Sequence, residues 1–492
     1  MAGLRLLFIL IISLFSTSSL FGADCKLVVN ADGRFIINKE DGSPFFLTFD
    51  TGWGIFEFIS KEDAEIYLRD RKEKGFNGFF GCLVFPFGNE PNYYGHSPWD
   101  NFDPATPNEK FFRHADFIIN KAIELDLFIG LLPSWGDKVA YSEELNFENA
   151  YQYGWFLGER YRDQNANIIW VIGGDRNPTD ENQTNVYRKI AEGIADGVND
   201  IRNEDGKADY STTMMTFHPQ PKSWGGGSSS TFYHYDDWLD FNLIQTSHIR
   251  RDDERSYTDI QADYALRPVK PCMEGEPPYE DHAVNWKTEQ GYFTDHDVRK
   301  AAYWSVFAGA AGHVYGSTTV WQFSSPDWQI RRYAAPTRGW WNQVKDGLPK
   351  GKDLPGAFDM KHLQDLMLSR PYFSRIPDLS LIDESGPGKG HVQSTMDRDG
   401  NYAFIYFPMG TITRLVYVNK LSGENINAWW YCPRDGKVYD QEGKVTNAPF
   451  LVFEKEMREF NPPNETETED WVLILDNAAQ NFGIPGKTGM DQ

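Results

Sequence analysis

Strand-like and helix-like segments alternate from residue 45 to about residue 320, and this alternation restricts the chain to few folds. The candidate strands are eight short apolar runs: Phe45 to Asp50, Gly78 to Phe85, Leu127 to Ser134, Asn167 to Asp175, Thr212 to Phe217, Phe241 to Ser247, Val269 to Glu276 and Gly312 to Ser317. Between most of them lie amphipathic, helix-like stretches: Lys61 to Lys74, Phe111 to Asp126, Phe147 to Tyr161, Val186 to Val198 and Asp297 to Ala311. Eight strands joined by helices predict a closed parallel (β/α)8 TIM barrel, an α/β fold. The helices after the fifth and sixth strands are poorly marked.

The sequence pattern changes after about residue 375. Short alternating runs are separated there by turn signals: Val392 to Thr395, Ala403 to Phe407, Leu415 to Val418, Asn427 to Tyr431 and Trp471 to Leu475. Such a pattern is typical of an all-β sandwich. We therefore predict a barrel over residues 24–375, a β-sandwich domain over 376–480 and a tail over 481–492. The linker is short and lacks a Gly/Ser tract, which favours a sandwich packed on the barrel.

The N-terminus indicates export. Arg5 precedes an apolar run from Leu6 to Phe15, and small residues follow. This is the pattern of a secretory signal peptide, which we place at residues 1–22, and it predicts a periplasmic, cell-surface or extracellular protein. Cys25 is a candidate lipidation site, but Asp24 occupies the position where a small residue is expected. No later segment reaches the ~18 apolar residues that a membrane span requires.

Composition and missing motifs exclude several function classes. A formal net charge of -23 over 492 residues argues against nucleic acid and anionic membranes as partners, because both require a basic face. The four cysteines form no CxxC pair, and the chain has no HExxH, GxSxG or GxGxxG motif. We therefore predict neither a metal nor another cofactor. Aromatic residues make up 15%, which suits sugar stacking as well as core packing.

The segment NIIWVIGGDRNP, from Asn167 to Pro178, is the most informative part of the chain. Its apolar run predicts a strand buried on both faces, and the run ends in Gly173, Gly174 and Asp175. A carboxylate at the carboxyl end of a barrel strand faces the active-site mouth, where glycines allow a substrate to approach the backbone. The alternative is that Asp175 only caps the next helix or pairs with Arg176.

A second acidic cluster ends the seventh candidate strand. PVKPCMEGEPPYE, from Pro268 to Glu280, carries Glu274 and Glu276 just before two prolines that stiffen the loop. Two carboxylates at two strand ends are what glycoside hydrolysis requires, since one protonates the leaving oxygen while the other attacks the anomeric carbon or activates a water. An acidic surface loop remains the alternative, above all for Glu274.

Other side chains at strand ends are candidates for substrate binding: Asp50, Trp53, Trp135, His218, His248 and Tyr279. Three arginines could hold a uronate carboxylate in a fork: Arg176, Arg250 and Arg251. Each of these residues has a structural alternative, either core packing or a solvated surface position.

The motifs together resemble those of the apiosidase-like glycoside hydrolases of family 140. The matching pieces are LTFDTGWGIF at Leu47 to Phe56, KEKGFNGF at Lys72 to Phe79, NIIWVIGGDRNP, FHPQP at Phe217 to Pro221, GEPPYEDH at Gly275 to His282 and AAYWSVFAGAAGHVYG at Ala301 to Gly316. The resemblance implies a (β/α)8 barrel followed by a β-sandwich that was historically labelled a collagen-binding domain. It also implies Asp175 as acid/base and Glu276 as nucleophile, with apiose of the pectin rhamnogalacturonan II as substrate.

Three points stay open at this level. Glu274 stands where similar chains lead us to expect Asp or Asn, so it is kept as the fallback nucleophile. Retention of anomeric configuration is favoured only by analogy with the clan of barrel glycosidases that place their carboxylates after strands four and seven. The alternative functions are a glycosidase of another plant polysaccharide and a non-catalytic carbohydrate- or matrix-binding protein.

Overall fold

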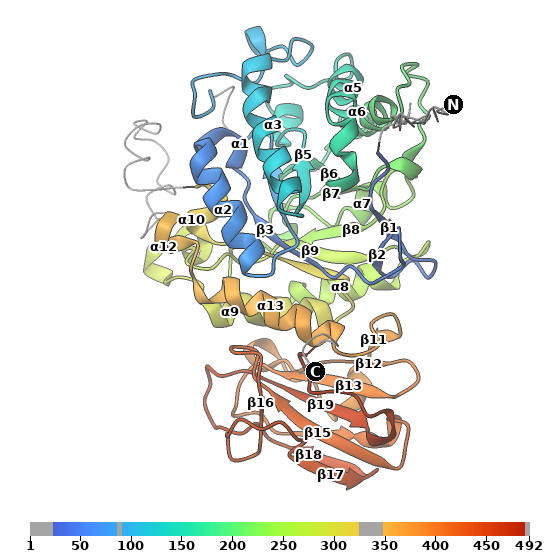
Figure 1. Cartoon of the computed structure of the whole chain (residues 1–492), viewed down its shortest axis with the longest axis vertical. Coiled ribbons are helices and arrows are strands. Elements are labelled where there is room, and N and C mark those ends of the chain that lie inside the picture. Colours follow the sequence, from blue (N-terminus) through green and yellow to red (C-terminus); the bar gives the residue numbers. More distant parts are fainter. Residues whose placement is uncertain (1–22, 86–90, 324–347, 488–492) are drawn as a thin grey trace, which may run out of the picture.

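An eight-stranded parallel sheet forms the N-terminal part of the protein, with helices around it (Figure 1). The computed structural model describes residues 23–85, 91–323 and 348–487, so the predicted signal peptide lies outside the described residues. The strands are β3 (Leu47–Thr51), β4 (Gly78–Cys82), β5 (Phe128–Leu132), β6 (Ile168–Gly173), β7 (Met215–His218), β8 (Asn242–Gln245), β9 (Cys272–Glu276) and β10 (Gly312–Tyr315). Each of them overlaps one of the eight predicted strands, which confirms the predicted α/β barrel.

The barrel closes between β7 and β8, the two ends of the strand order. The Asp240 backbone N–H donates to the Met215 carbonyl (2.9 Å), and Thr216 Oγ1 donates to the Phe241 carbonyl (2.7 Å). The remaining neighbours are joined by parallel ladders, with one register shift between β8 and β9. A closed barrel gathers the carboxyl ends of all eight strands at one mouth, which is where the candidate site residues lie.

Helices of very different length surround the strands. They are α1 (Ile55–Phe58), α2 (Lys61–Glu73), α3 (Glu109–Glu124), α4 (Asp137–Ala140), α5 (Ala150–Arg160), α6 (Glu181–Val198), α7 (Ser230–Tyr233), α8 (Arg255–Ala265), α9 (Asp295–Phe307), α10 (Thr318–Trp321), α12 (Leu348–Gly351) and α13 (Pro355–Leu368). All five predicted helices are present. The helix after the fifth strand, α7, is a single turn, and α8 after the sixth buries only Ser256, Ile260 and Asp263. Neither could give a strong amphipathic pattern.

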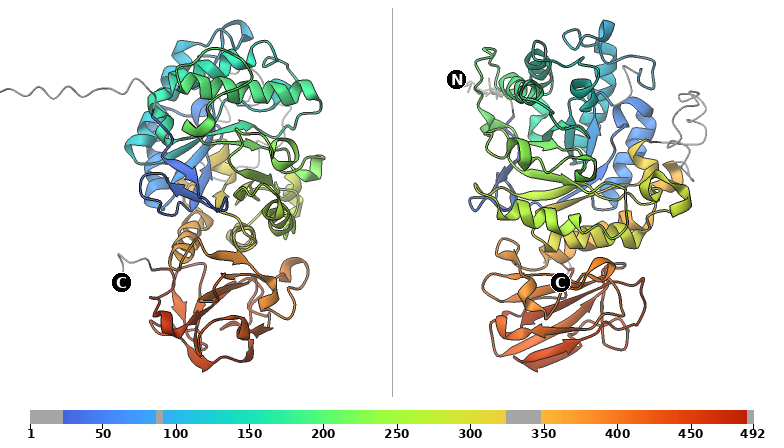
Figure 2. Two further views of the ribbon diagram at one scale, coloured as in Figure 1. Left: turned by 90° about the vertical axis from the view of Figure 1, so that its right-hand side faces the viewer. Right: turned by 180° about the vertical axis from the view of Figure 1, so that it is seen from behind.

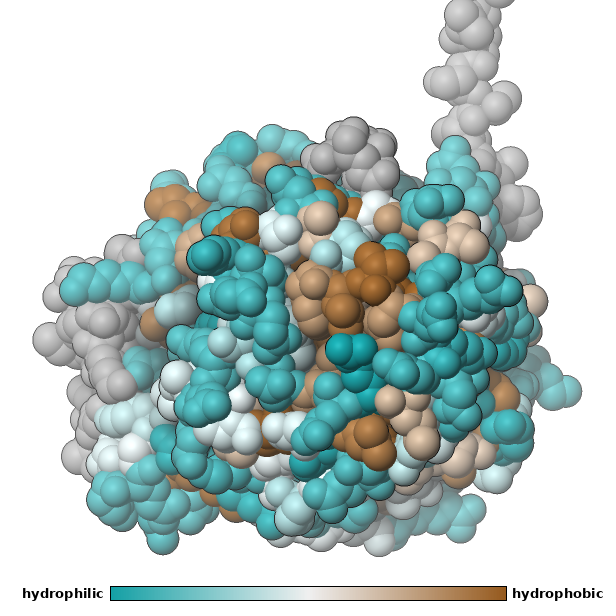
Figure 3. All heavy atoms as spheres, turned by 90° about the horizontal axis from the view of Figure 1, so that it is seen from below, coloured by the Kyte–Doolittle hydropathy of each residue, from teal (hydrophilic) through white to brown (hydrophobic). Residues whose placement is uncertain are grey.

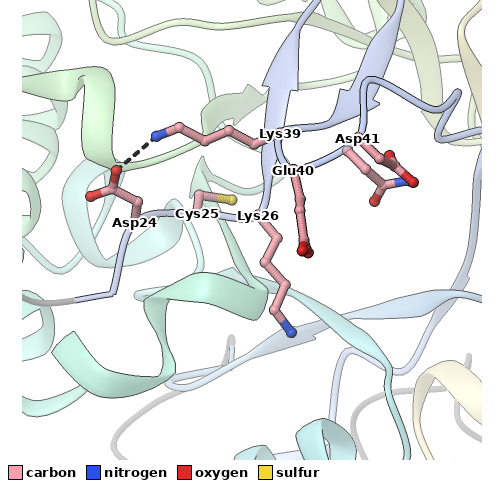
Figure 4. Close-up of a pocket in the computed structure, with 7 residues that line it drawn as sticks. Asp24, Cys25, Lys26, Lys39, Glu40 and Asp41 are labelled. Carbon is pink, nitrogen blue, oxygen red and sulfur yellow. Dashed lines mark hydrogen bonds and ion pairs between the residues drawn. The ribbon is translucent and has the colours of Figure 1, made fainter.

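A small hairpin lies beside the amino ends of the barrel strands. It consists of β1 (Leu27–Val29) and β2 (Ile36–Asn38), and the Cys25 backbone N–H donates to the Thr212 carbonyl (2.9 Å). Figure 4 shows the pocket of about 490 Å³ at this place, lined mostly by charged side chains. The Cys25 thiol is buried 3.6 Å from the Ile168 carbonyl, and burial raises its pKa to about 12. A lipid on this sulfur would disrupt that packing.

The C-terminal part is antiparallel. Its large sheet has the order β11 (Arg375–Pro377), β12 (Gln393–Asp397), β13 (Tyr402–Phe407), β19 (Trp471–Asn477), β15 (Asn425–Tyr431) and β16 (Val438–Tyr439), with β17 (Leu451–Glu454) also paired to β15. A second, two-stranded sheet pairs β14 (Arg414–Tyr417) with β18 (Met457–Phe460). The predicted sandwich is therefore present. β17 and β18 were not predicted, because half of their side chains are exposed and only Phe453 and Phe460 are buried.

Both faces of the large sheet are buried, because the barrel covers one of them (Figures 1 and 2). Ile405 and Phe407 point into the core of the sandwich, whereas Phe404 and Tyr406 point to α9 of the barrel. The Tyr406 ring stacks on Tyr303 at 4.9 Å. This extended contact agrees with the packing that we expected from the short linker.

A buried ion pair joins the two parts. Arg299 of α9 lies 2.9 Å from Asp470, and the side chains of both residues are inaccessible to solvent. Arg299 also contacts Asp359 of α13 at 2.7 Å. Desolvation offsets most of the attraction within such a buried pair, but removing one partner would leave a buried charge with less compensation.

The surface of the sandwich carries few large apolar side chains. Figure 3 shows this end of the molecule, with apolar patches among hydrophilic atoms. Among described residues 376–487, the large apolar side chains that are well exposed are Val445, Val452 and Met457, and none is aromatic. Within the described part of the chain, no helix combines the length and the apolar character needed to cross a membrane.

Candidate active site

Asp175 and Glu276 meet at the carboxyl end of the barrel. Asp175 follows β6 and Glu276 is the last residue of β9. One oxygen of each carboxylate and one ring nitrogen of His218 all lie within 4.8 Å of one another. The fold thus brings together two carboxylates that are about a hundred residues apart in the sequence.

The backbone before Asp175 adopts a conformation that glycine permits. Gly173 and Gly174 have φ values of 87° and 132°, and a Cβ on Gly174 would lie 2.9 Å from the Trp135 ring. Asp175 itself has a φ of 53°, which is uncommon for a residue with a side chain. Gln245 of β8 donates to Asp175 Oδ1 at 2.8 Å. The glycines and this hydrogen bond together orient the carboxylate toward the barrel mouth. A positive φ at a residue with a side chain, as at Asp175, is a form of backbone strain that is common at functional sites.

Two imidazoles hold Glu276. Nε2 of His218 lies 3.2 Å from Oε2, and Nε2 of His248 lies 3.1 Å from Oε1. The Tyr279 backbone N–H donates to Nδ1 of His248 (3.3 Å), so Nδ1 is the acceptor and Nε2 carries the proton that faces Glu276. The carboxylate is therefore fixed through both of its oxygens.

The environments of the two carboxyl groups separate their pKa values. Burial, with a further contribution from the negative charge of Glu276, raises the pKa of Asp175 to about 6. Burial alone would also raise the pKa of Glu276, but the hydrogen bond from His248 and the close approach of His218 outweigh it and lower this pKa to about 2. Below about pH 6, one group is then protonated while its neighbour is ionised. This is the division that a proton donor and a nucleophile require.

A wall of aromatic rings surrounds the Glu276 histidines. Trp53 Nε1 donates to the Tyr279 hydroxyl at 2.7 Å, and the Trp53 ring lies 5.2 Å from His218. The Trp135 ring lies 5.7 Å from His218, and the Tyr279 ring lies 4.2 Å from His248. The structure thus brings Trp53, Trp135, His218, His248 and Tyr279 together around the carboxylate pair, as the sequence predicted for strand-end residues.

Comparison with known proteins identifies the family. The family model described as "Apiosidase-like, catalytic domain" matches residues 30–374. The chain belongs to the apiosidase-like family. A second model, "Putative collagen-binding domain of a collagenase", matches residues 376–476. Among curated proteins, no match to the chain was found.

Solved structures support the same assignment. A protein described as a glycoside hydrolase is 30% identical with a TM-score of 0.79, over 92% of this chain and 97% of the other. A glycoside hydrolase family 5 protein from Bacteroides vulgatus ATCC 8482 is also 30% identical, with a TM-score of 0.80, over 94% of this chain and 95% of the other. The apiosidase-like protein is therefore a glycoside hydrolase.

Glu274, the fallback nucleophile, faces elsewhere in this apiosidase-like barrel. The β8–β9 pairing shifts register, so that Ile244 pairs with Glu274 and Gln245 with Glu276, leaving Gly275 in a bulge. Glu274 is fully buried and accepts a hydrogen bond from Thr246. Burial raises its pKa to about 8. A carboxyl group that stays protonated near neutral pH is a poor nucleophile. Both the direction of Glu274 and its raised pKa therefore favour Glu276 as the nucleophile.

Asp50 does not line the mouth, contrary to the prediction that it binds substrate. Its Oδ2 lies 2.7 Å from Nε of Arg71 and accepts from the Tyr67 hydroxyl (2.9 Å), and both partners belong to α2. Successive side chains of a strand alternate between its faces, and Asp50 occupies the face that points outward to this helix. The buried ion pair gives Asp50 a structural role.

The three arginines considered for a uronate have different places in the structure. Nη1 of Arg176 donates to the Asp175 carbonyl at 2.6 Å, so this side chain stays beside the proton donor. Arg250 pairs with Asp253 at 3.2 Å, and Arg251 pairs with Asp297 at 3.2 Å. Arg176 is thus the arginine of the three that joins the site directly.

Four further residues of the site were missed by sequence reasoning. Gln245 contacts Asp175, and the His282 ring lies 4.4 Å from His248. Trp286 lies 5.6 Å from His248, and Trp224 lies 5.4 Å from Trp286. His282 belongs to the GEPPYEDH motif and could have been noted on that ground. The other three required the three-dimensional structure.

Within the described residues, one group has the composition of a metal site: Asp175, His218 and Glu276. A divalent cation there would need an unprotonated His218 nitrogen as ligand. The same three groups also suffice for hydrolysis without a metal, because they supply a proton donor, an ionised carboxylate and an imidazole that orients it. The metal-free site stays a prediction.

Proposed function

We propose that this protein is an exported apiosidase that removes apiose from side chains of the pectin rhamnogalacturonan II. Membership of the apiosidase-like family supports the choice of sugar. The observation that carries the catalytic part is the pairing of a carboxyl group whose pKa is about 6 with one whose pKa is about 2 at the same barrel mouth. The pattern at residues 1–22, one arginine followed by an apolar run and small residues, is that expected of a signal peptide and supports export.

In the first step, Glu276 attacks the anomeric carbon while the bond from that carbon to the leaving oxygen breaks. The proton of Asp175 passes to the leaving oxygen, so the leaving sugar departs as a neutral alcohol. His218 and His248 keep Glu276 ionised and oriented for this attack. The products of the step are a glycosyl ester on Glu276 and an ionised Asp175.

In the second step, a water oxygen attacks the anomeric carbon while the ionised Asp175 accepts a proton from that water. The ester bond breaks, Glu276 leaves as a carboxylate and Asp175 is again protonated. Two inversions at the same carbon give net retention. Carboxyl groups of retaining enzymes lie about 5–5.5 Å apart and those of inverting enzymes about 6.5–9.5 Å. One oxygen of Asp175 and one of Glu276 lie within 4.8 Å of each other, and the placement of the two carboxylates after β6 and β9 favours retention by analogy with barrel glycosidases.

The enclosed side of the site suits a small terminal sugar. Trp53 and Trp135 are only 2% and 4% exposed, and Tyr279 is equally buried. Aromatic faces bind the apolar faces of sugar rings while polar groups hold the hydroxyls. Buried rings on this side of the carboxylate pair favour a single terminal residue over a polymer chain that passes through, which fits removal of a side-chain sugar.

Incubation with rhamnogalacturonan II oligosaccharides tests the proposal. We expect free apiose as the product, and NMR taken in the first minutes should show the anomer that the substrate carried. Glu276→Gln is the matched control and should release none. Release of a different sugar would show that the enzyme is a glycosidase of another plant polysaccharide and not an apiosidase. The assembled carboxylate pair argues against the alternative of a non-catalytic binding protein. Binding of the oligosaccharide without any turnover would favour that alternative.

A further inference from the structure

A second pair of aromatic side chains lies beside the site, separate from the wall of Trp53 and Trp135. Trp224 ends a 3-10 turn after β7 (Lys222–Trp224), and Trp286 ends another after β9 (Val284–Trp286). Their ring centroids are 5.4 Å apart with an interplanar angle of 32°. The Trp286 ring also lies 5.6 Å from His248, which donates to Glu276. The pair is therefore continuous with the catalytic centre.

The backbone at Trp286 is held in a conformation that bulky residues rarely adopt. Asn285 and Trp286 have φ values of 54° and 55° in succession. The Asn285 N–H donates to the His248 carbonyl at 2.7 Å, and the Trp286 N–H donates to the Ala283 carbonyl at 3.0 Å. Strain of this kind persists where surrounding contacts enforce it, and such positions cluster at ligand-binding sites. The loop is thus built to present the Trp286 ring next to His248.

The proton donor faces the same side of the barrel. Asp175 Oδ1 accepts from Gln245 of β8, and the loops that carry Trp224 and Trp286 follow the strands on either side of β8. The proton of Asp175 goes to the leaving oxygen, so the leaving group must lie on the side that Asp175 faces. Trp224 and Trp286 lie on the two loops that flank this strand, and Trp286 contacts His248 beside Glu276.

Solvent exposure distinguishes the two aromatic groups. Trp53 and Trp135 are 2% and 4% exposed, whereas Trp224 is 41% exposed. An enclosed wall suits the terminal sugar that is cut off. An open platform suits a sugar ring that remains attached to a longer chain, because the rest of that chain needs a path to solvent.

We propose that Trp224 and Trp286 form a stacking platform for the leaving-group sugar, a pyranose ring of the polymer that carries the cleaved residue. The proposal rests on the proposed function, since it assigns the leaving-group side of the same reaction. The C–H face of the pyranose packs on the indole rings, and the platform orients the glycosidic oxygen toward Asp175. Trp224 and Trp286 thereby select substrates by their leaving group.

Two substrates with the same glycone test the platform: a rhamnogalacturonan II oligosaccharide and the methyl glycoside, whose leaving group has no ring. The quantity measured is the ratio of kcat/KM for the oligosaccharide to kcat/KM for the methyl glycoside. Loss of one stacked ring should lower this ratio by about tenfold in Trp224→Ala. Trp224→Phe retains an aromatic face and should keep most of the ratio. Tyr235→Ala removes a ring that is 79% exposed on another loop and should leave the ratio at its wild-type value.

The ratio of kcat/KM values distinguishes failure of the platform proposal from failure of the proposed function. A wild-type ratio in both Trp224→Ala and Trp286→Ala, with active protein, overturns the platform and leaves the proposed function standing. If the wild type releases a sugar other than apiose, the same comparison is made with that sugar as the glycone. No hydrolysis of any glycone by the wild type removes the proposed function and the platform together. Thermal unfolding of each variant identifies a loss that comes from misfolding, and Trp224→Ala, at an exposed position, should fold normally.

Discussion

The alkaline limb of the kcat/KM profile depends on the pKa of Asp175, which a hydrogen bond from Gln245 helps to set. Asp175 must be protonated in the first step, and its pKa is raised to about 6, so activity should fall about tenfold per pH unit above pH 6. Glu276 must be ionised, and its pKa is about 2, so activity should be level between about pH 2 and pH 6 wherever the protein stays folded. The hydrogen bond from Gln245 stabilises the ionised form of Asp175 and therefore lowers its pKa.

Gln245→Met removes the donor and keeps a side chain of similar length. The ionised Asp175 loses a stabilising contact, so its pKa should rise and the alkaline limb should move to higher pH. The Gln245 contact is weaker than the effects of burial and of Glu276, so we expect a shift of at most about one pKa unit, which corresponds to about 1.36 kcal/mol. The assay is kcat/KM from pH 4 to pH 9 on the methyl glycoside. An alkaline limb that stays in place or moves to lower pH would refute Asp175 as the titrating acid.

Three further predictions follow from the structure. Asp175→Ala should lower kcat/KM about 10²- to 10⁴-fold on a sugar leaving group but far less on a nitrophenyl leaving group, which departs in the first step without a proton. Turnover of the nitrophenyl glycoside is then limited by the second step, and added azide should speed that step with retained configuration, as steady-state kinetics and NMR would show. Asp470→Asn leaves the buried Arg299 with fewer counter-charges, so denaturant unfolding should show a loss of about 3–5 kcal/mol, whereas Asp435→Asn at a less buried position should lose little. Dialysis against EDTA should leave kcat unchanged, and a loss that zinc or calcium restores would assign a metal to Asp175, His218 and Glu276.

The architecture could be predicted because it depends on local patterns. The run from Ile168 to Ile172 is apolar on both faces, and the structure makes it a barrel strand with Asp175 at its end. The C-terminal strand Tyr402–Phe407 was predicted over Ala403 to Phe407 from a different local signal, a short run bounded by turn residues. Elements without such a signal were missed or uncertain. The single turn of α7 and the exposed strands β17 and β18 bury too little apolar surface to leave a pattern.

Individual roles at the site depended on which face a side chain occupies. Asp50 and Glu276 both lie near the end of a strand, yet Asp50 faces α2 and Glu276 faces the mouth. The bulge at Gly275 separates Glu274 from Glu276, and no sequence signal distinguishes these two glutamates by direction. Gln245 contacts Asp175, which lies 70 residues earlier in the sequence. Trp286 contacts His248, which follows a different strand. Both contacts form only when the barrel closes.

The central claim is that Glu276 forms a covalent bond to the sugar. Asp175→Ala, given a nitrophenyl glycoside, should accumulate the glycosyl ester because the second step lacks its base. Mass spectrometry of the quenched and digested protein should then find the sugar on the peptide that contains Glu276, and the label should be absent in Glu276→Gln. A label on Glu274, or an active Glu276→Gln beside an inactive Glu274→Gln, would contradict the account.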